Sequence, residues 1–347
     1  ESMPGTHSTG RSAALYTANF GAPLVRALNR ASEALLKGTQ MSVADAPLLR
    51  PRGALSIAAP GAEAALRARA ELSTPSHPVH PISVSEALAM APLLRPERIV
   101  AALYEPGVMD IDVDALQRGC LERFRERGGV LACDARVRRC ERVDGGWKVE
   151  TDRRSETARV VVNAAGAWAG EFAALADAAH VPLEPRRRTA IVVDAPADTD
   201  LTRLPLVDLA GGDAYFKPEA RRIMASLGEQ VPVPAHDAQP DELDIARTVD
   251  WLEAETVIEV RRAPHAWAGL RTFAPDECPV VGFDPIRSDF FWLAGQGGYG
   301  IMMALSLARA ARGLIVGEGL PEELVAAGVT EEALAPGRAA IGRQPDR

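Results

Sequence analysis

The sequence is poor in the residue types that build metal sites, disulfide frameworks and membrane spans. Its 347 residues include four cysteines and six histidines, and neither type recurs at metal-ligand spacing. The cysteines therefore indicate reduced thiols of a cytoplasmic protein. No apolar run approaches the roughly 18 residues of a membrane span, and no secretory signal is visible. We expect no bound metal and no passage into or across a membrane.

Positive charge is also scarce. Lysine and arginine total 39 against 47 acidic residues, which gives a net charge of −8. Binding to nucleic-acid phosphates needs a basic face, so a nucleic-acid partner is not expected. The hydrophobic content of 47% is typical of a globular protein, and the length suffices for a large two-lobed enzyme or two ordinary domains.

Two segments combine a buried strand, small residues and a helix. Phe290–Ala294 is followed by Gly295-Gln296-Gly297-Gly298-Tyr299-Gly300 and a predicted helix from Ile301 to Ile315. Arg159–Asn163 is followed by Ala164-Ala165-Gly166-Ala167 and a helix from Trp168. Such turns let backbone amides and a helix N-terminus approach a ligand, although a tight turn that only packs a helix on a sheet remains the alternative. Because β-rich material separates the two units, we expect a cofactor domain interrupted by a substrate domain.

A third segment, His7–Ala14, is rich in hydrogen-bond donors. We expect it at the start of a helix over residues 12–37, broken near Gly21-Ala22-Pro23. Its hydroxyls and Arg11 are suited to phosphate or ribityl oxygens, and an N-cap with a solvated arginine is the alternative.

The remaining pattern predicts helices and strands around these segments. Ser83 and Glu86 form a predicted capping box, and the Asp144-Gly145-Gly146 turn predicts a hairpin. The expected helices are 62–72, 83–90, 112–127 and 241–254, and the expected strands are 55–58, 130–132, 137–143, 147–151, 188–194, 214–217 and 222–227.

Four motifs together resemble one family. HSTGRSAA from His7, VNAAGAW from Val162, WAGLR from Trp267 and GQGGYGI from Gly295 are similar, in order and spacing, to the FAD-dependent D-amino-acid oxidase and glycine oxidase superfamily. Within it the resemblance is nearest to bacterial D-arginine dehydrogenases, and it runs from Pro4 to about residue 335.

The resemblance implies an α/β fold of two domains. A Rossmann-like FAD-binding domain of the glutathione-reductase type would be interrupted by an antiparallel-β substrate domain. The implied FAD-binding domain covers residues 1–45, 105–183 and 266–335, and the substrate domain covers 46–104 and 184–265.

The resemblance also implies noncovalent FAD, because no cysteine stands where a covalent flavin link is expected. The implied cofactor residues come from the same motifs and from the adenine contact. They are Ser8, Thr9, Gly10, Arg11, Ser12, Ala13, Ala14, Leu15, Val137, Ala165, Gly166, Gly298, Tyr299, Gly300, Ile301, Met302 and Met303.

For the substrate, the resemblance implies that Arg271 forks a carboxylate, that Tyr215 joins it and that Arg188 lies nearby. Without the family, each also fits a solvated arginine or a core tyrosine. Gly298, Phe20, Ala54 and Met302 complete the implied substrate pocket.

The implied reaction is oxidative deamination of a D-amino acid. Hydride passes from Cα to flavin N5 without side-chain acid–base catalysis, and the imino acid hydrolyses to a 2-oxo acid and ammonia. A quinone or oxygen would reoxidise the flavin. A sarcosine- or glycine-type amine oxidase is the alternative within the fold.

Two departures from the family affect these expectations. The GxGxxG strand–turn–helix unit is not found before Glu1, so we expect either a truncated sequence or a product that holds FAD poorly, with a noncatalytic remnant as the alternative. Four polar positions of D-arginine dehydrogenases correspond here to Leu15, Phe20, Ala54 and Met302. Burying the guanidinium of a substrate without an acidic partner is unfavourable, so we expect a substrate with an apolar or modest side chain. Asp208 is either a different acidic partner for the substrate or a surface residue.

Overall fold

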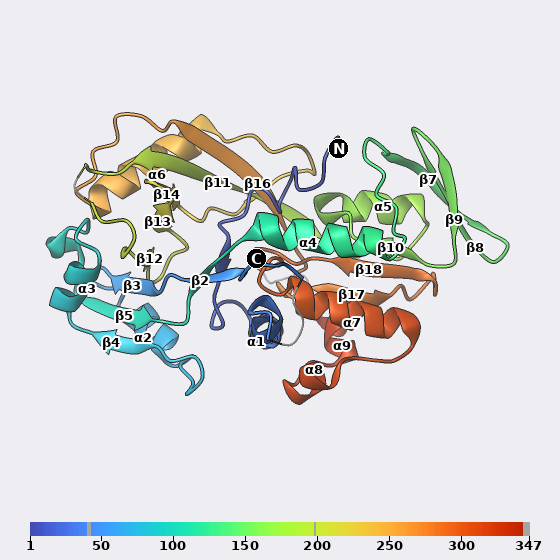
Figure 1. Ribbon diagram of the computed structural model, residues 1–347, viewed down its shortest axis with the longest axis horizontal. Coiled ribbons are helices and arrows are strands. Elements are labelled where there is room, and N and C mark those ends of the chain that lie inside the picture. Colours follow the sequence, from blue (N-terminus) through green and yellow to red (C-terminus); the bar gives the residue numbers. More distant parts are fainter. Residues whose placement is uncertain (40–42, 198, 343–347) are drawn as a thin grey trace.

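The computed structural model describes residues 1–39, 43–197 and 199–342. Figure 1 shows a large sheet with helices α2, α3 and α6 at one end of the molecule and a smaller sheet with α5 and α7 at the other. Residues 40–42 and 198, which fall inside the expected domain ranges, lie outside the described residues. The mixed α/β class of the fold is confirmed, and the division of the chain into two domains stays a prediction.

The large sheet has the order β15-β11-β14-β13-β12-β3-β5-β4, and β16 pairs with β11. Its neighbours are antiparallel except β12 and β3, which run parallel. The strands are β3 Ala54–Ala58, β4 His80–Ile82, β5 Ala101–Glu105, β11 Glu184–Asp194, β12 Leu206–Leu209, β13 Tyr215–Glu219, β14 Arg222–Ser226, β15 Val231–Pro232 and β16 His265–Phe273.

Alternation along these strands divides the large sheet into two faces. Leu55, Ile191, Phe216 and neighbouring apolar residues form one core with α3 (Val84–Met90) and α6 (Glu242–Glu255). The opposite face carries Tyr215, Met224 and their register partners, and it is turned toward the rest of the chain. That second face becomes a wall of the site described below.

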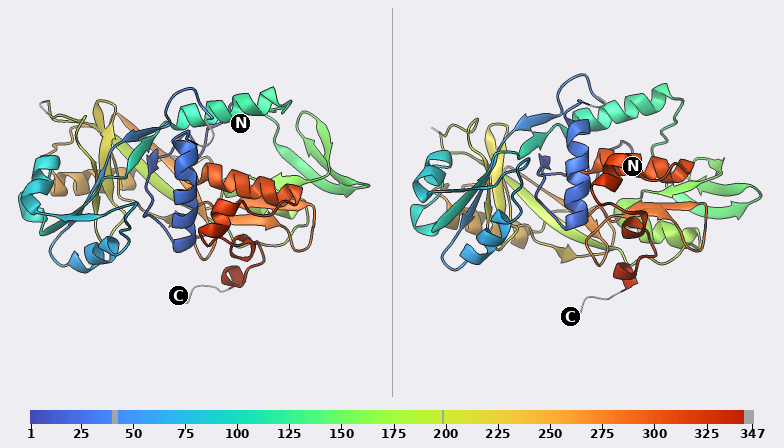
Figure 2. Two further views of the ribbon diagram at one scale, coloured as in Figure 1. Left: turned by 60° about the horizontal axis from the view of Figure 1, so that its bottom comes forward. Right: turned by 90° about the horizontal axis from the view of Figure 1, so that it is seen from below.

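The small sheet has the order β10-β18-β17, with β10 (Val161–Asn163) parallel to β18 (Phe290–Ala294) and β17 (Val280–Phe283) antiparallel. Phe291 packs in the core that includes α1 and α7 residues. Phe290 and Trp292, on the other face, pack with α5 (Ala169–Leu175). Figure 2 shows α1 (Pro23–Leu36) standing between the large sheet and α7 (Ala304–Val316).

The other elements connect these layers. Two small antiparallel sheets have the orders β1-β6-β2 and β7-β8-β9. The elements are β1 Leu15–Tyr16, β2 Leu49–Pro51, β6 Met109–Ile111, β7 Val137–Val143, β8 Gly146–Thr151, β9 Ser155–Ala158, α2 Glu63–Ala70, α4 Val113–Glu126, α8 Glu322–Ala326, α9 Glu331–Leu334, α10 Ala339–Gly342 and the 3-10 turns η1 Pro96–Arg98 and η2 Gly166–Trp168. Among the helices in the described part of the chain, none has the length and apolarity to cross a bilayer.

Most of the predicted elements are confirmed, including the hairpin of β7 and β8 and the capping box of Ser83 and Glu86. Three expectations are wrong. The helix expected over 12–37 covers only Pro23–Leu36, and residues 4–11 form successive turns rather than a helix start, because Ala14 takes φ +56° and Pro23 suits a first helical turn. Residues 130–132 form no strand, and Val130 is 67% exposed. Helix α7 begins at Ala304 rather than Ile301.

The carboxylate of Asp284 ties the small sheet together. It is 3% exposed and accepts hydrogen bonds from Trp292 Nε1 at 2.9 Å and from the Ala179 amide at 2.9 Å. The amides of Ile286 and Arg287 also donate to it, at 2.9 and 2.8 Å. These bonds fix the strand that leads into the glycine-rich turn.

Replacing Asp284 with alanine should destabilise the protein by about 2–4 kcal/mol, because four donors, among them the buried indole of Trp292, lose their acceptor. Chemical denaturation measures this change. Asp250→Ala on the exposed face of α6 is the matched control and should stay within about 0.5 kcal/mol. Equal unfolding midpoints for both variants would contradict the role of Asp284.

Candidate active site

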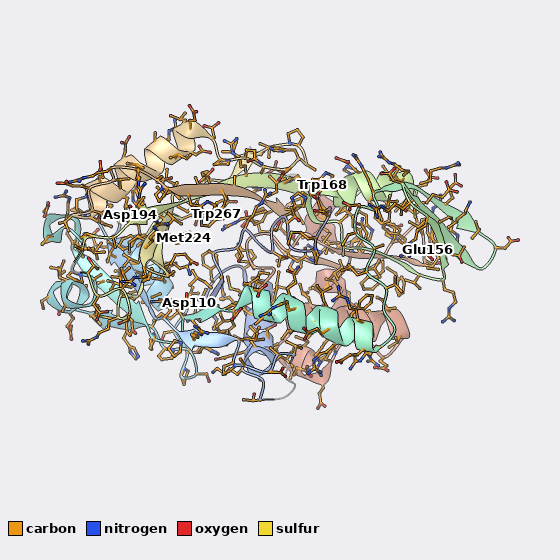
Figure 3. All side chains as sticks on the ribbon, turned by 45° about the horizontal axis from the view of Figure 1, so that its top comes forward. Asp110, Glu156, Trp168, Asp194, Met224 and Trp267 are labelled. Atoms are coloured by element: carbon orange, nitrogen blue, oxygen red, sulfur yellow. The ribbon has the colours of Figure 1, made fainter. Side chains whose placement is uncertain are left out.

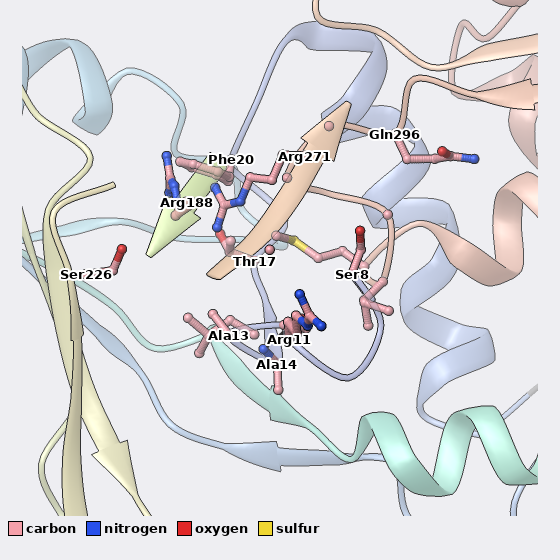
Figure 4. Close-up of a pocket in the computed structure, with 18 of the residues that line it drawn as sticks. Ser8, Arg11, Ala13, Ala14, Thr17, Phe20, Arg188, Ser226, Arg271 and Gln296 are labelled. Carbon is pink, nitrogen blue, oxygen red and sulfur yellow. Dashed lines mark hydrogen bonds between the residues drawn. The ribbon is translucent and has the colours of Figure 1, made fainter. Parts of the chain in front are cut away.

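A cavity of about 480 Å³ lies between the large sheet, the N-terminal segment and the glycine-rich turn (Figure 4). The residues of its wall that the sequence predicted are Ser8, Thr9, Arg11, Ser12, Ala13, Ala14, Leu15, Phe20, Ala54, Gly166, Arg188, Asp208, Tyr215, Arg271, Gly298, Gly300, Ile301 and Met302. The fold thus brings together segments that are almost 300 residues apart in the sequence.

The N-terminal segment is fastened to β16. The Ser8 hydroxyl donates to the Leu270 carbonyl at 2.8 Å, and Arg11 donates to the Ala268 carbonyl at 3.0 Å. Arg11 also donates to Asp237 at 2.5 Å. Ala14 takes φ +56°, and its amide donates to the Ser12 hydroxyl at 3.0 Å. Because the Arg11 guanidinium is occupied by protein groups, the segment offers a ligand chiefly its backbone and the Thr9 hydroxyl.

The glycine-rich turn presents backbone amides without partners. Gly295 and Gly297 take φ of +68° and +55°, conformations that favour glycine. Among the described residues, the amides of Gly298, Gly300, Ile301 and Met302 donate to no protein acceptor. They precede the N-terminus of α7, where the helix dipole favours electron-rich groups. Unpaired amides beside a cavity form a cradle for a ligand with several acceptor atoms.

Two arginines meet at one end of the cavity, and Figure 4 shows them close together next to Phe20. Arg188 donates to the Gly228 carbonyl, to the Glu229 carbonyl at 3.3 Å and to Asp213 at 3.1 Å. By contrast, the Arg271 guanidinium makes no hydrogen bond or ion pair with the residues that the structure describes.

Burial and the neighbouring charge of Arg188 lower the pKa of Arg271 to about 10. The guanidinium still carries its charge at neutral pH. Arg271 is partly buried. A cation with little access to water and no counter-ion is unfavourable unless a ligand supplies the anion, and a planar guanidinium suits a carboxylate. Tyr215, 9% exposed, lines the same end of the cavity. The arrangement has the charge and geometry that suit a carboxylate.

An apolar patch continues the wall along the large sheet. It contains Ala54, Leu206 and Met224, with Trp267 packed against it. Figure 3 marks Met224 and Trp267. This patch can accommodate an aliphatic part of a ligand next to the carboxylate site.

Further polar residues of the wall were not found from the sequence: Thr17, Asn19, Arg69, Glu105, Asp213 and Ser226. Arg69 belongs to a helix with the sequence of a surface helix, and Glu105 is the last residue of a strand. The sequence around each residue therefore does not indicate a binding site. Gly10, Val137, Ala165, Tyr299 and Met303 lie outside the residues that line the cavity, and Val137 starts β7 as the partner of Thr151. Their cofactor contacts stay predictions.

Comparison with known proteins agrees with this geometry. The family model for FAD dependent oxidoreductases matches residues 1–314, so the chain belongs to that family, as the four motifs predict. Mitochondrial dimethylglycine dehydrogenase of Mus musculus is 31% identical over 253 residues, which cover 67% of this chain and 28% of that protein. The chain thus spans less than a third of the length of this curated relative.

Solved structures share the fold. Glycine oxidase from Geobacillus kaustophilus superposes with a TM-score of 0.76 at 20% identity, over 92% of this chain and 86% of that one. Iminodiacetate oxidase from Chelativorans sp. BNC1 gives a TM-score of 0.79 at 18% identity, over 95% and 89%. At these identities the likeness establishes the fold alone.

The cofactor of the family is FAD. The residues present fit a flavin, since four unpaired amides at Gly298–Met302 match the acceptor-rich edge of its ring system. Gly166 supports this fit: it lines the cavity, and an added Cβ there would meet no atom within 4 Å. The described residues hold no group of three or more His, Cys, Asp or Glu arranged for a metal ion.

Gly298 sets the position of Arg271. A Cβ added to Gly298 would lie 2.9 Å from Arg271 Nη1, so Gly298→Ala should displace the guanidinium. We expect carboxylate affinity, measured by calorimetry, to fall about tenfold or more. Gly170→Ala in α5, where the added Cβ meets nothing within 4 Å, is the control. Full carboxylate affinity in the Gly298 variant would show that this close contact is unimportant.

Proposed function

We propose that this chain oxidises the Cα–N bond of a D-amino acid with an apolar or modest side chain, yielding a 2-oxo acid and ammonia after hydrolysis of the imino acid. The observation that carries the proposal is the unpaired guanidinium of Arg271 in a cavity that also contains the amide cradle. A carboxylate ligand and an acceptor-rich ring are the two partners that such a cavity lacks.

In this proposal Arg271 binds the substrate carboxylate through two parallel hydrogen bonds. Tyr215 donates a third, and Arg188, held by Asp213 and two carbonyls, adds positive charge without moving. Because Gly298 leaves only enough room for a hydrogen beside Arg271, the carboxylate would be held next to the amide cradle. The protein contributes orientation and burial rather than a side-chain acid or base.

FAD would be held noncovalently by the Ser8–Leu15 backbone and by the amides between Gly298 and Met302. When bound, it supplies the hydride acceptor for the substrate Cα–H, and a quinone or oxygen reoxidises it. The apolar patch of Ala54, Leu206 and Met224, with Phe20 and Met302 on the cavity wall, receives the side chain. The D configuration is supported by the resemblance of the motifs.

A second candidate is oxidation of a secondary or tertiary amine of the sarcosine type. Its support is the match to dimethylglycine dehydrogenase and to glycine and iminodiacetate oxidases. Both candidates use the same carboxylate site, so they differ in which N-substituent the cavity admits. Release of ammonia marks the first reaction, whereas oxidation of an N-methyl group releases formaldehyde.

Arg271→Ala should weaken substrate binding by about 30-fold or more, because loss of a charge-assisted pair shielded from water costs roughly 2–5 kcal/mol. KM and flavin content are measured together, and flavin content should not change. Arg261→Ala, an exposed arginine, is the control. Unchanged substrate affinity in the Arg271 variant would exclude its assigned role.

A substrate panel tests the reaction itself. With the FAD-loaded protein we expect ammonia from D-methionine, D-leucine or D-phenylalanine at higher kcat/KM than from D-arginine. Exclusive turnover of D-arginine would contradict the expected side chain. Turnover of sarcosine or dimethylglycine alone, with formaldehyde as product, would replace the proposal by the second candidate.

A further inference from the structure

The cavity also contains a buried carboxyl group without a cationic partner. Glu105 ends β5, is 9% exposed and lines the cavity. Its Oε1 accepts a hydrogen bond from Asn19 Nδ2 at 3.0 Å and one from the Thr17 hydroxyl at 3.4 Å. Both donors are neutral. Within the described residues, Glu105 forms no ion pair, and Oε2 accepts no hydrogen bond.

Arg69 is a nearby cation, but it is committed elsewhere. Its guanidinium pairs with Asp208 and donates to the Ser56 hydroxyl at 2.6 Å, while Ser56 donates to Asp208 at 3.2 Å. The Arg69–Asp208 pair is therefore neutral as a unit. Burial, together with the charge of Asp208, raises the pKa of Glu105 despite the attraction of Arg69. A cationic ligand would relieve this unfavourable burial.

The register of the large sheet places Glu105 away from the carboxylate site. Tyr215 pairs with Asp208, Asp208 with Ser56, and β3 with β5, so three strand spacings separate β13 from β5. At about 4.8 Å each, the two backbones lie roughly 14 Å apart. Tyrosine and glutamate side chains span part of that distance. The gap that remains between the two side chains is wider than the separation between the carboxylate and the amine on one α-carbon. It is wide enough to hold a substrate side chain.

Ala54 opens the path between the two sites. It is the register partner of Glu105 in β3 and shares its face, and its methyl group leaves the Glu105 carboxylate uncovered toward the cavity. Ala54 is one of the four positions at which the family resemblance implies a polar side chain that this chain lacks. In the structure an acid reaches the same part of the cavity from the neighbouring strand.

We propose that Glu105 binds the terminal ammonium of a substrate side chain with a short aliphatic stem, so that the favoured substrates resemble D-lysine or D-ornithine. Arg271 takes the carboxylate at one end, Glu105 takes the ammonium at the other, and the apolar patch contacts the stem. This inference rests on the proposed reaction and its carboxylate site. It departs from the apolar or modest side chain proposed above by adding a terminal cation to an aliphatic stem.

The hydrogen bonds of Glu105 favour an ammonium over a guanidinium. Oε1 already accepts two bonds, so only Oε2 remains for the ligand. A guanidinium is recognised best by two parallel bonds to both carboxylate oxygens, whereas an ammonium is a compact charge that one oxygen can serve. The same carboxylate thus selects against D-arginine.

The test compares D-lysine with D-norleucine, which lacks only the terminal nitrogen. In the FAD-loaded wild type we expect kcat/KM to favour D-lysine by about tenfold or more. In Glu105→Gln this ratio should fall toward 1, while Glu97→Gln, an exposed glutamate of the same sheet region, keeps it. A wild-type preference for D-norleucine, or an unchanged ratio in Glu105→Gln, would overturn the proposal.

A binding measurement keeps the test independent of catalysis and of any folding defect in the variant. Calorimetry of the wild type compares 6-aminohexanoate with hexanoate, which differ only in the distal ammonium. We expect the amine to bind about tenfold more tightly. Equal affinities would reject the role of Glu105, whereas tighter amine binding without oxidation of any D-amino acid would reject only the proposed reaction.

Discussion

The unpaired guanidinium of Arg271, on a partly buried side chain, is the constraint on which the rest of the site depends. Burial of a positive charge without a counter-ion is unfavourable, and the fold adds a second arginine next to it. The free energy of this arrangement becomes favourable when a carboxylate enters. Arg188 is itself positively charged and cannot act as a counter-ion for Arg271. Its hydrogen bonds to Asp213 and to two backbone carbonyls hold it next to Arg271. The unpaired charge of Arg271 therefore contributes to the free energy of ligand binding.

The register of the large sheet places further polar residues at a distance from Arg271, so the two ends of the site differ in charge. One face of the large sheet carries Tyr215, Asp208 and Ser56 in one row, with Ala54 and Glu105 in the next. Charged groups of opposite sign thus stand at two ends of one apolar wall. The glycine-rich turn lies against the cavity because Gly297 and Gly298 have no side chains, and a Cβ at Gly298 would lie 2.9 Å from Arg271 Nη1. Substitution on either element changes the geometry of both.

Much of this architecture can be predicted from the sequence. Buried strands, capping boxes and glycine turns are local signals, so β18, α3 and the 295–300 turn were predicted correctly. Residues 12–22 were not, because the helical spacing of residues 24–35 was extended to them, while Ala14 adopts a left-handed conformation and Leu15–Tyr16 forms a strand. Glu105 was missed for another reason: only strand pairing places it opposite Ala54. Comparing single positions with a family does not show that strand pairing brings an acid from a neighbouring strand to the same place.

The central claim is that the counter-ion of Arg271 is the carboxylate of a ligand and not an acidic side chain of the protein. A crystal structure of the FAD-loaded protein soaked with a nonreactive carboxylate tests this most directly. The account predicts both carboxylate oxygens within about 3 Å of the Arg271 guanidinium, beside Tyr215 and the Gly298 turn. A carboxylate bound elsewhere, or Arg271 paired with an acidic side chain of the protein, would contradict it.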